Sequence, residues 1–326
     1  MAGWRAALLA CGLLAAPAIE AAPALELVST IPLAGVKGRI DHMSADVKGH
    51  RLFVAALGND TVEIIDTQSG QRRTLAGFGE PQGVLYVPES GRVFIANGSA
   101  DRVDIFDAGT LTVLHRIQDL PDADNVRYDD RARKVVVGYG RGALRLLDPR
   151  TGEPAGEIAL PGHPEAFQIE ARGKRAFVNV PSAHGVVVVD LEARTTLATW
   201  GTAPASANFP MALDESGQRL FVGMRMPASL LVYDTQTGKI AAKVPIGSDA
   251  DDVFYDPRHK RIYAICGEGR IDVIRQDGPD RYVAEGSIKT AARARTGLFV
   301  PDEERLYVAA PADGPSPARL LVYRVR

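Results

Sequence analysis

Apolar residues recur along the chain in short runs that repeat about every 42 residues. One set of runs has the form LFVA, which is typical of a buried β-strand, and the runs begin at Leu52, Val93, Val135, Ala176, Leu220, Ile262 and Leu306. A second set follows about ten residues later and ends on Asp66, Asp107, Asp148, Asp190 and Asp234, with Arg275 and Arg324 in the last two repeats. A period near forty residues with several strands in each period is the signature of a β-propeller.

One period divides into four expected strands, at residues 40–45, 51–56, 61–66 and 72–76. The linkers between them read VKGH, LGND and TQSG, and they are rich in the Gly, Asn and Asp that tight antiparallel turns require. The third linker recurs after other runs as DPRTG and DTQTG. An aspartate that begins such a turn can accept a hydrogen bond from its own downstream amide. We therefore interpret the five repeat aspartates as turn-forming residues and not as catalytic ones.

The last period contains only three strands before the chain ends, GLFVPDE, RLYVAA and RLLVYRV. Residues 25–33, LELVSTIPL, precede the first complete period and can supply the missing fourth strand. Pairing of this segment with the C-terminal strands would close the ring and remove an exposed sheet edge. The sequence therefore predicts an all-β, seven-bladed propeller with four antiparallel strands per blade, formed as a single domain by residues 25–326.

The texture of the repeats resembles the YVTN-type β-propeller family, a WD40-like group of repeat proteins. The resemblance is carried by EPQGVLYVPESGRVFIAN at 80–97 and DRVDIFDAGTLTVLHRI at 101–117, and it is echoed by NFPMALDESGQRLFVGM in the second half. It implies the propeller fold and an exported protein with a ligand-binding or scaffolding role. The tryptophan-aspartate signature of WD repeats is absent, since the chain has only Trp4 and Trp200.

The N-terminus has the pattern of a secretory signal peptide, which we expect to span residues 1–22. A single positive charge at Arg5 precedes a mostly apolar stretch, and small residues around Ala22 suit a signal peptidase. Attachment of lipid at Cys11 is disfavoured because the apolar stretch before it is very short. We therefore expect a periplasmic or secreted protein without a transmembrane segment.

The composition of the chain excludes some classes of partner but does not assign a function. The chain has 46% hydrophobic and 24% charged residues and a net charge of −2, so nucleic acid is not an expected partner. After cleavage Cys266 would be the last cysteine, and its place at the end of a strand favours a small buried hydrophobe. We expect a monomer.

Candidate site residues lie where each blade's innermost strand begins, because these seven points meet at one mouth of the central channel. A generic blade has Pro-x-Gly there, as in Pro81-Gln82-Gly83, but several blades place charged or polar residues instead. The expected ligand-binding residues are Arg39, Asp41, His42, Asp124, Asn125, Glu165, Asp251, Asp252 and Arg295. Gln82, Asp122, His163, Phe209 and Asp249 occupy neighbouring or equivalent positions, and a second layer at the ends of the second strands includes Asn97, Tyr139, Arg141, Asn179 and Arg225.

Three interpretations of this ring are open. The polar residues can be structural, capping turns and tying adjacent blades together. They can bind an organic ligand, with Arg39 and Arg295 facing an anionic group while the carboxylates accept hydroxyls. They can also hold Ca²⁺ or Mg²⁺ through oxygen ligands, in a placement that resembles the axial metal of gluconolactonase and paraoxonase propellers. The candidate metal ligands are Asp41, Asp124, Asn125 and Asp252.

The function expected from the sequence is that of an exported binding protein that recognises a small molecule or an envelope protein at the polar channel mouth. One alternative is a metal-dependent, lactonase-like hydrolase or lyase in which His42 or Glu165 moves a proton. Another is a protein-interaction scaffold.

Overall fold

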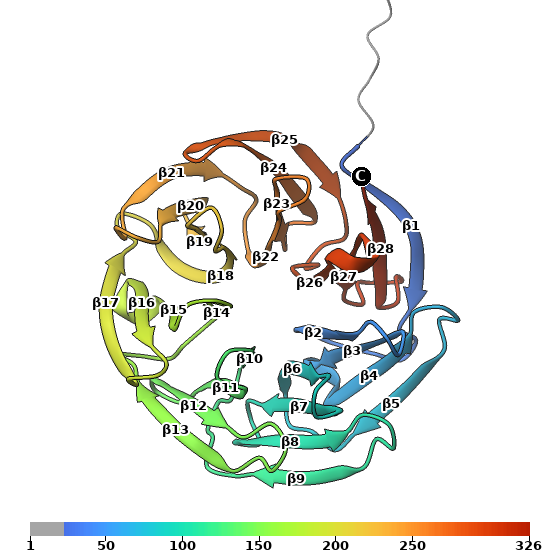
Figure 1. Cartoon of the computed structure of the whole chain (residues 1–326). Helices are drawn as coiled ribbons and strands as arrows, with labels where there is room; N and C mark the ends of the chain where they lie inside the picture. The colour runs from blue at the N-terminus through green and yellow to red at the C-terminus, as the bar shows by residue number, and fades with distance from the viewer. Residues whose placement is uncertain (1–22) are drawn as a thin grey trace, which may run out of the picture.

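Seven four-stranded antiparallel sheets surround a common axis as the blades of a propeller, in a computed structural model that describes residues 23–326 (Figure 1). The expected signal peptide and Cys11 lie outside the described residues. The predicted fold class is confirmed in blade number, strands per blade and mode of closure. No helix among residues 23–326 is long and apolar enough to cross a membrane.

In blades 1 to 6 the strands run from the axis outward in the order of their numbers, and in blade 7 the order from the axis is β26, β27, β28 and β1. Blade 1 contains β2 (Met43–Asp46), β3 (Arg51–Ala56), β4 (Thr61–Asp66) and β5 (Arg72–Ala76). Blade 2 contains β6 (Pro81–Val87), β7 (Arg92–Asn97), β8 (Arg102–Asp107) and β9 (Val113–Ile117). Blade 3 contains β10 (Val126–Asp129), β11 (Lys134–Tyr139), β12 (Ala143–Leu147) and β13 (Pro154–Ala159). Blade 4 contains β14 (Phe167–Ile169), β15 (Arg175–Val180), β16 (Gly185–Asp190) and β17 (Thr195–Gly201).

The second half of the ring repeats this plan with some longer strands. Blade 5 contains β18 (Ser206–Asp214), β19 (Arg219–Met226), β20 (Ala228–Asp234) and β21 (Ile240–Pro245). Blade 6 contains β22 (Ala250–Asp256), β23 (Arg261–Cys266), β24 (Arg270–Gly278) and β25 (Arg281–Lys289). Blade 7 combines β26 (Thr296–Val300), β27 (Arg305–Ala310), β28 (Arg319–Val325) and β1 (Leu25–Pro32). Three short 3₁₀ turns occur at η1 (Leu57–Asn59), η2 (Pro181–Ala183) and η3 (Pro301–Glu303).

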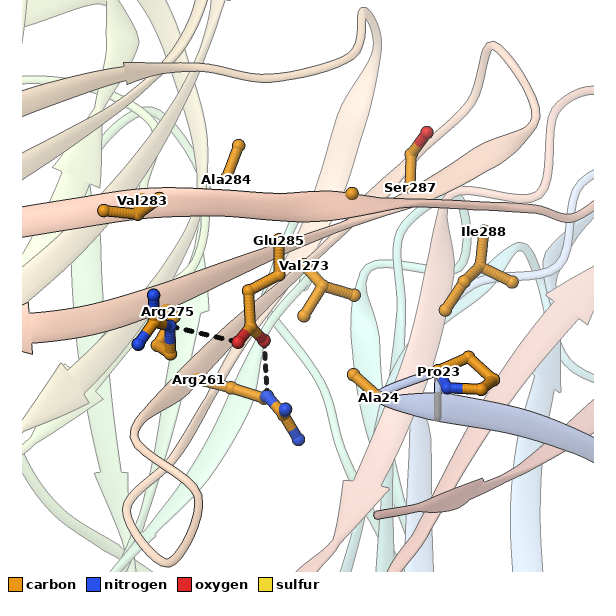
Figure 2. Close-up of a pocket in the computed structure, with 11 residues that line it drawn as sticks. Pro23, Ala24, Arg261, Val273, Arg275, Val283, Ala284, Glu285, Ser287 and Ile288 are labelled. Carbon is orange, nitrogen blue, oxygen red and sulfur yellow. Dashed lines mark hydrogen bonds and ion pairs between the residues drawn. The ribbon is translucent and has the colours of Figure 1, made fainter. Parts of the chain in front are cut away.

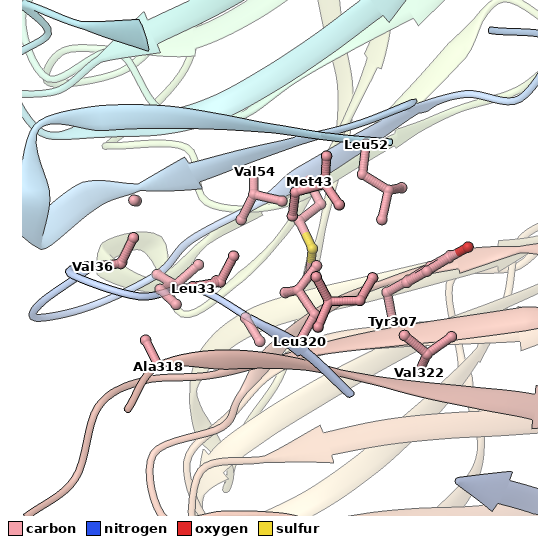
Figure 3. Close-up of a cluster of buried hydrophobic side chains, with 14 of the residues drawn as sticks. Leu33, Val36, Met43, Leu52, Val54, Tyr307, Ala318, Leu320 and Val322 are labelled. Atoms are coloured by element: carbon pink, nitrogen blue, oxygen red, sulfur yellow. The ribbon is translucent and has the colours of Figure 1, made fainter. Parts of the chain in front are cut away.

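The ring is closed by the N-terminal strand, as the sequence predicts. β1 pairs antiparallel with β28, with Leu25 opposite Val325 and Pro32 opposite Arg319. Beside this pair, a cluster of buried side chains joins blades 1 and 7, and Figure 3 shows Met43 of β2 reaching toward the side chains of blade 7. Leu33, directly after β1, is fully buried in this cluster. Closure therefore rests on both backbone pairing and apolar packing.

The second, third and fourth strands of blade 1 match the expected residues, but its innermost strand does not. β2 spans Met43–Asp46, whereas the sequence predicts a strand at 40–45. The reason is a β-bulge at the channel mouth, which interrupts the regular ladder and leaves the amide of His42 free to donate to the carbonyl of Gln82 in the next blade at 3.3 Å. The segment before Met43 still pairs with β3, but Asp41 and His42 both lie opposite Ala55: the amide of Asp41 donates to the carbonyl of Ala55 at 2.7 Å, and the amide of Ala55 donates to the carbonyl of His42 at 3.0 Å.

The repeat aspartates form turns, as predicted. In each of the five, one carboxylate oxygen accepts hydrogen bonds from the amides two and three residues later. These bonds stabilise the carboxylate and contribute to the lowered pKa of all five groups, and at Asp190 the ammonium of Lys174, 2.8 Å away, lowers the pKa most. Cys266 is also placed as expected, because it is fully buried at the end of β23 and burial raises the pKa of its thiol to about 12.

The turn after β20 provides a measurable test of this role. Asp234 accepts the amides of Gln236 and Thr237 at 2.9 and 2.8 Å, so Asp234→Ala should lower the free energy of unfolding by about 1 kcal/mol at pH 7. The pKa of Asp234 is lowered in the fold, so this contribution is present above about pH 4 and is lost as pH falls through the lowered pKa. Urea denaturation at pH 7 and pH 3 measures it. Asp234→Asn, which keeps an acceptor oxygen, should cost less, and equal losses from both variants would contradict the assignment.

Candidate functional site

Residues from all seven blades line a cavity of about 220 Å³ at one mouth of the channel. The linker from each blade's outer strand to the next blade's inner strand delivers most of them, because the inner strands converge on the axis (Figure 1). The lining residues are Arg39, Gln82, Asp122, Asp124, His163, Glu165, Phe209, Arg225, Asp251 and Arg295. A glycine explains one close approach, since a Cβ on Gly83 would collide with the backbone carbonyl of Asp124.

The structure brings most of the predicted site residues to two neighbouring places. Five of them line the mouth cavity, namely Arg39, Asp124, Glu165, Asp251 and Arg295. His42 and Asp252 line a second cavity of about 220 Å³, which shares no lining residue with the first. Asp41 and Asn125 line neither cavity and are buried.

Asp251 is the centre of an ion-pair network that joins four blades. Its carboxylate lies 2.5 Å from Nη2 of Arg225, 2.9 Å from Nε of Arg295 and 3.9 Å from Nη2 of Arg39. Asp249 adds a second carboxylate, 2.9 Å from Nη1 of Arg295 and 3.5 Å from Nη2 of Arg225. The guanidinium of Arg225 also lies 3.9 Å from the centre of a phenyl ring, that of Phe209. The mouth arginines are therefore already paired with carboxylates of the protein.

A second charged group is centred on His42 and lies deeper in the channel. Its Nε2 is 3.7 Å from an oxygen of Asp41, and its Nδ1 is 3.7 Å from an oxygen of Asp252. Burial disfavours the imidazolium, but these two carboxylates outweigh that penalty and raise the pKa of His42 to about 10. Asp41 also lies 2.7 Å from Arg39, and burial raises its pKa in opposition to both cations. His42 is thus held as a cation by the protein's own carboxylates.

Two carboxylates at the mouth have no ion-pair partner among residues 23–326, and they are Asp124 and Glu165. Asp124 is only 6% exposed, and burial raises its pKa. Burial and the charge of Asp124 raise the pKa of Glu165 to about 7. Buried carboxylates that repel each other are stabilised by a bound cation, a hydroxyl donor or a proton. These two side chains can therefore accept a hydrogen bond or an ion pair from a ligand, and Glu165 can exchange a proton near neutral pH.

The predicted metal site gains no direct support from the arrangement of side chains. Within residues 23–326, no group of three or more His, Cys, Asp or Glu side chains is placed to hold a metal ion. Of the four proposed ligands, Asp41 contacts Arg39, and Oδ2 of Asp252 accepts the amide of Gly297 at 2.8 Å. The assignment of Ca²⁺ or Mg²⁺ to these residues stays a prediction.

The sequence predicts the location of several other cavity residues but does not identify them as binding residues. Gln82, Asp122, His163 and Phe209 lie at inner-strand starts, and the repeat alignment places them at the mouth but gives no reason to select them. Arg225 ends a second strand, and it belongs to the cavity through its pairing with Asp251. Other second-layer residues are structural: the amide nitrogen of Asn97 donates to the carbonyl of Ile95, and that of Asn179 donates to the carbonyl of Phe209.

A larger cavity of about 350 Å³ lies on the outer side of blade 6, along β25 and the start of β1 (Figure 2). Its charged residues satisfy one another, because Glu285 lies 2.6 Å from Nε of Arg261 and 3.1 Å from Nε of Arg275. No comparable unpaired group faces this cavity among its lining residues. The channel mouth is therefore the better candidate site.

Comparisons with known proteins agree with the fold and say less about chemistry. No family model matches the chain. Protein NirF of Stutzerimonas stutzeri is 24% identical in an alignment of 269 residues that covers 73% of this chain and 66% of NirF, so the match spans slightly under two thirds of that relative. Among solved structures, a chain of Kuenenia stuttgartiensis hydrazine synthase superposes with a TM-score of 0.74 at 16% identity, covering 85% of this chain and 95% of that one. A chain of a mitotic checkpoint complex gives a TM-score of 0.79 at 15% identity over 98% of this chain and 99% of that one. At these identities the two structures support the propeller fold alone.

Proposed function

We propose that this protein binds a small ligand at the mouth of its channel, through groups that the seven blades hold in place. The observation that carries the proposal is the pair Asp124 and Glu165, one buried and one partly buried carboxylate that line a cavity and lack an ion-pair partner among the described residues. Burying such groups costs free energy unless something compensates them. A propeller supplies this kind of rigid concave site without needing to move on binding.

The ligand class follows from which charges are already neutralised. Arg39, Arg225 and Arg295 each contact Asp41, Asp249 or Asp251, so an anionic group would have to displace one of these pairs. Asp124 and Glu165 instead offer acceptor oxygens. The site therefore suits a ligand that presents an ammonium group or several hydroxyls, and the arginines serve mainly to fix the carboxylates around it.

The setting that we propose is the periplasm or the exterior of the cell, with the protein acting as a monomer. The support is the signal-peptide pattern at residues 1–22 and the likeness of the repeats to the YVTN-type family of exported propellers. Cys266, the one cysteine among residues 23–326, is buried, which fits that setting because no disulfide is needed to stabilise a core of this size.

The binding proposal is tested with putrescine, glucose and Ca²⁺ as separate ligands, and their binding is measured by thermal shift and isothermal titration calorimetry. We expect saturable binding of at least one of them, weakened about tenfold or more in the double variant Asp124→Asn with Glu165→Gln. For a cationic ligand, affinity should rise from pH 6 to pH 8, because Glu165 loses its proton through a pKa of about 7.

The matched control for this experiment is Asp122→Asn. Asp122 lines the same cavity but its side chain is 62% exposed, so its charge is screened and its loss should change affinity little. If none of the ligands binds, or if the double variant binds as well as the native protein, the assignment of Asp124 and Glu165 as the ligand-binding pair is wrong.

A second candidate function is an enzyme that moves a proton at this mouth, such as a lyase or a hydrolase. The observation that favours it is the pKa of Glu165, which is raised to about 7 at the surface of the cavity. A general acid or base works best when its pKa lies near the working pH. In this proposal Glu165 is the proton-transfer group, and the paired arginines hold the surrounding carboxylates in position.

A further inference from the structure

The second cavity of the channel has a different chemical character from the mouth. It has a volume of about 220 Å³ and is lined by residues of six blades, none of which also lines the mouth cavity. Much of its wall is apolar, with Met43, Leu85, Phe254 and Leu298 among the lining residues. A mixed cavity of this kind typically recognises the apolar part of a ligand by its walls and the polar part by a few fixed groups.

Arg127, on the inner strand β10, is the group in this cavity that lacks a charged partner. No carboxylate of residues 23–326 lies within ion-pair distance of its guanidinium. Its Nη1 donates to the carbonyl of Val126 at 3.0 Å, and the guanidinium lies 5.8 Å from the ring centre of Phe167. Burial lowers its pKa, but an arginine remains charged in proteins. The remaining N–H groups of this positively charged guanidinium are free to donate hydrogen bonds to an anion.

The carboxylate that lines the same cavity, that of Asp252, already interacts with other groups of the protein. Asp252 accepts the amide of Gly297 at 2.8 Å, and its other oxygen lies 3.7 Å from Nδ1 of His42, whose positive charge compensates it. A second donor is available at Ser44. Its Oγ accepts the amide of Tyr86 at 2.9 Å, which leaves the hydroxyl proton of Ser44 to be donated to another group.

We propose that this second cavity binds a small monocarboxylate with a short aliphatic tail, with the carboxylate on Arg127 and Ser44 and the tail against Met43 and Leu85. An arginine fork matches the geometry of a carboxylate, and the match strengthens where water is excluded. The volume equals roughly seven water molecules at about 30 Å³ each, so an acid of about six heavy atoms fits. The site is separate from the mouth site in residues and opposite to it in the charge it selects.

Calorimetric titration with butyrate, butanamide and butylamine tests this proposal on the chain without residues 1–22. Butyrate should bind saturably, and the uncharged amide and the amine should bind at least tenfold more weakly, since neither can form an ion pair with Arg127. Arg127→Gln should weaken butyrate binding about tenfold or more. Arg141→Gln, which removes an exposed arginine near the same end of blade 3, should leave it unchanged.

Folding is checked for each variant by circular dichroism and thermal denaturation. If Arg127→Gln does not fold, Ser44→Ala provides the second measurement, with an expected loss of severalfold in butyrate affinity. The double variant Asp124→Asn with Glu165→Gln should not weaken butyrate binding, because it removes negative charge that acts on Arg127, and this separates the site from the mouth. The proposal is overturned if the native protein shows no saturable binding of butyrate, or if folded Arg127→Gln binds it with native affinity.

Discussion

Asp251→Ala should lower the free energy of unfolding by about 3–5 kcal/mol, because it removes one member of a largely buried ion-pair network and leaves the others uncompensated. Asp251 is 9% exposed, and its carboxylate lies within 4 Å of Arg39, Arg225 and Arg295. Without it, three guanidinium groups from three blades face one cavity, and Asp249 and Asp41 are the carboxylates that still form ion pairs with them. Positive charges that share a partly buried site repel one another strongly.

Chemical denaturation at low and high salt measures this effect. The matched control is Asp249→Ala, since Asp249 contacts two of the same arginines but its side chain is 39% exposed. Its removal should cost about 1 kcal/mol or less, and this loss should shrink with added salt. Equal costs for the two variants would show that Asp251 does not have the central role assigned to it.

Removal of residues 1–33, which include β1, should prevent the chain from folding as a stable monomer. The deletion exposes the edge of β28 and takes away Leu25, Ile31 and Leu33, which are 2%, 8% and 0% exposed. Their burial contributes about 1.5–3 kcal/mol each, and together this approaches the total stability of about 5–15 kcal/mol of a typical protein. An unpaired strand edge also promotes association between chains.

Size-exclusion chromatography and thermal denaturation monitored by circular dichroism measure the outcome. Removal of residues 1–22 is the matched control, because the strand and its apolar contacts begin at Leu25. That shorter deletion should leave a monomer with an unchanged Tm. A monomer that unfolds cooperatively at the same temperature after removal of residues 1–33 would contradict the closure of the ring by β1.

Most of the fold could be predicted from the sequence because its determinants are local and repeated. The strands at 51–56, 61–66 and 72–76 follow from apolar runs between turn residues, and the structure has them at the same bounds. The innermost strand is different. Its regular pairing starts only at Met43, because a β-bulge places both Asp41 and His42 opposite Ala55, and the hydrophobic pattern of one repeat does not show that bulge.

The location of the candidate site could be predicted from the sequence, but the pairing of its charged groups could not. Departures from the repeat pattern point to the inner-strand starts, and Asp124, Glu165 and Asp251 do line the mouth cavity. Sequence alone does not say that Asp251 is paired while Glu165 is not, because the pairing depends on how far each side chain reaches across the axis. Arg127 lies two residues further along an inner strand, past the positions where the repeat pattern is broken. Its lack of a partner is visible only in three dimensions.

At the junction of the first and last blades, the mouth combines residues that are made early in synthesis with residues that are made late. Arg39 lies just after the N-terminal strand, Arg295 lies just before β26, and both contact Asp251. The hydroxyl of Thr296 donates to the carbonyl of Ile40, a contact between residues 256 positions apart. During synthesis the charged rim is therefore complete only after Arg295 and Thr296 have been made. A molecule that recognises the finished rim binds only completed rings, and its binding energy holds the two ends of the chain together.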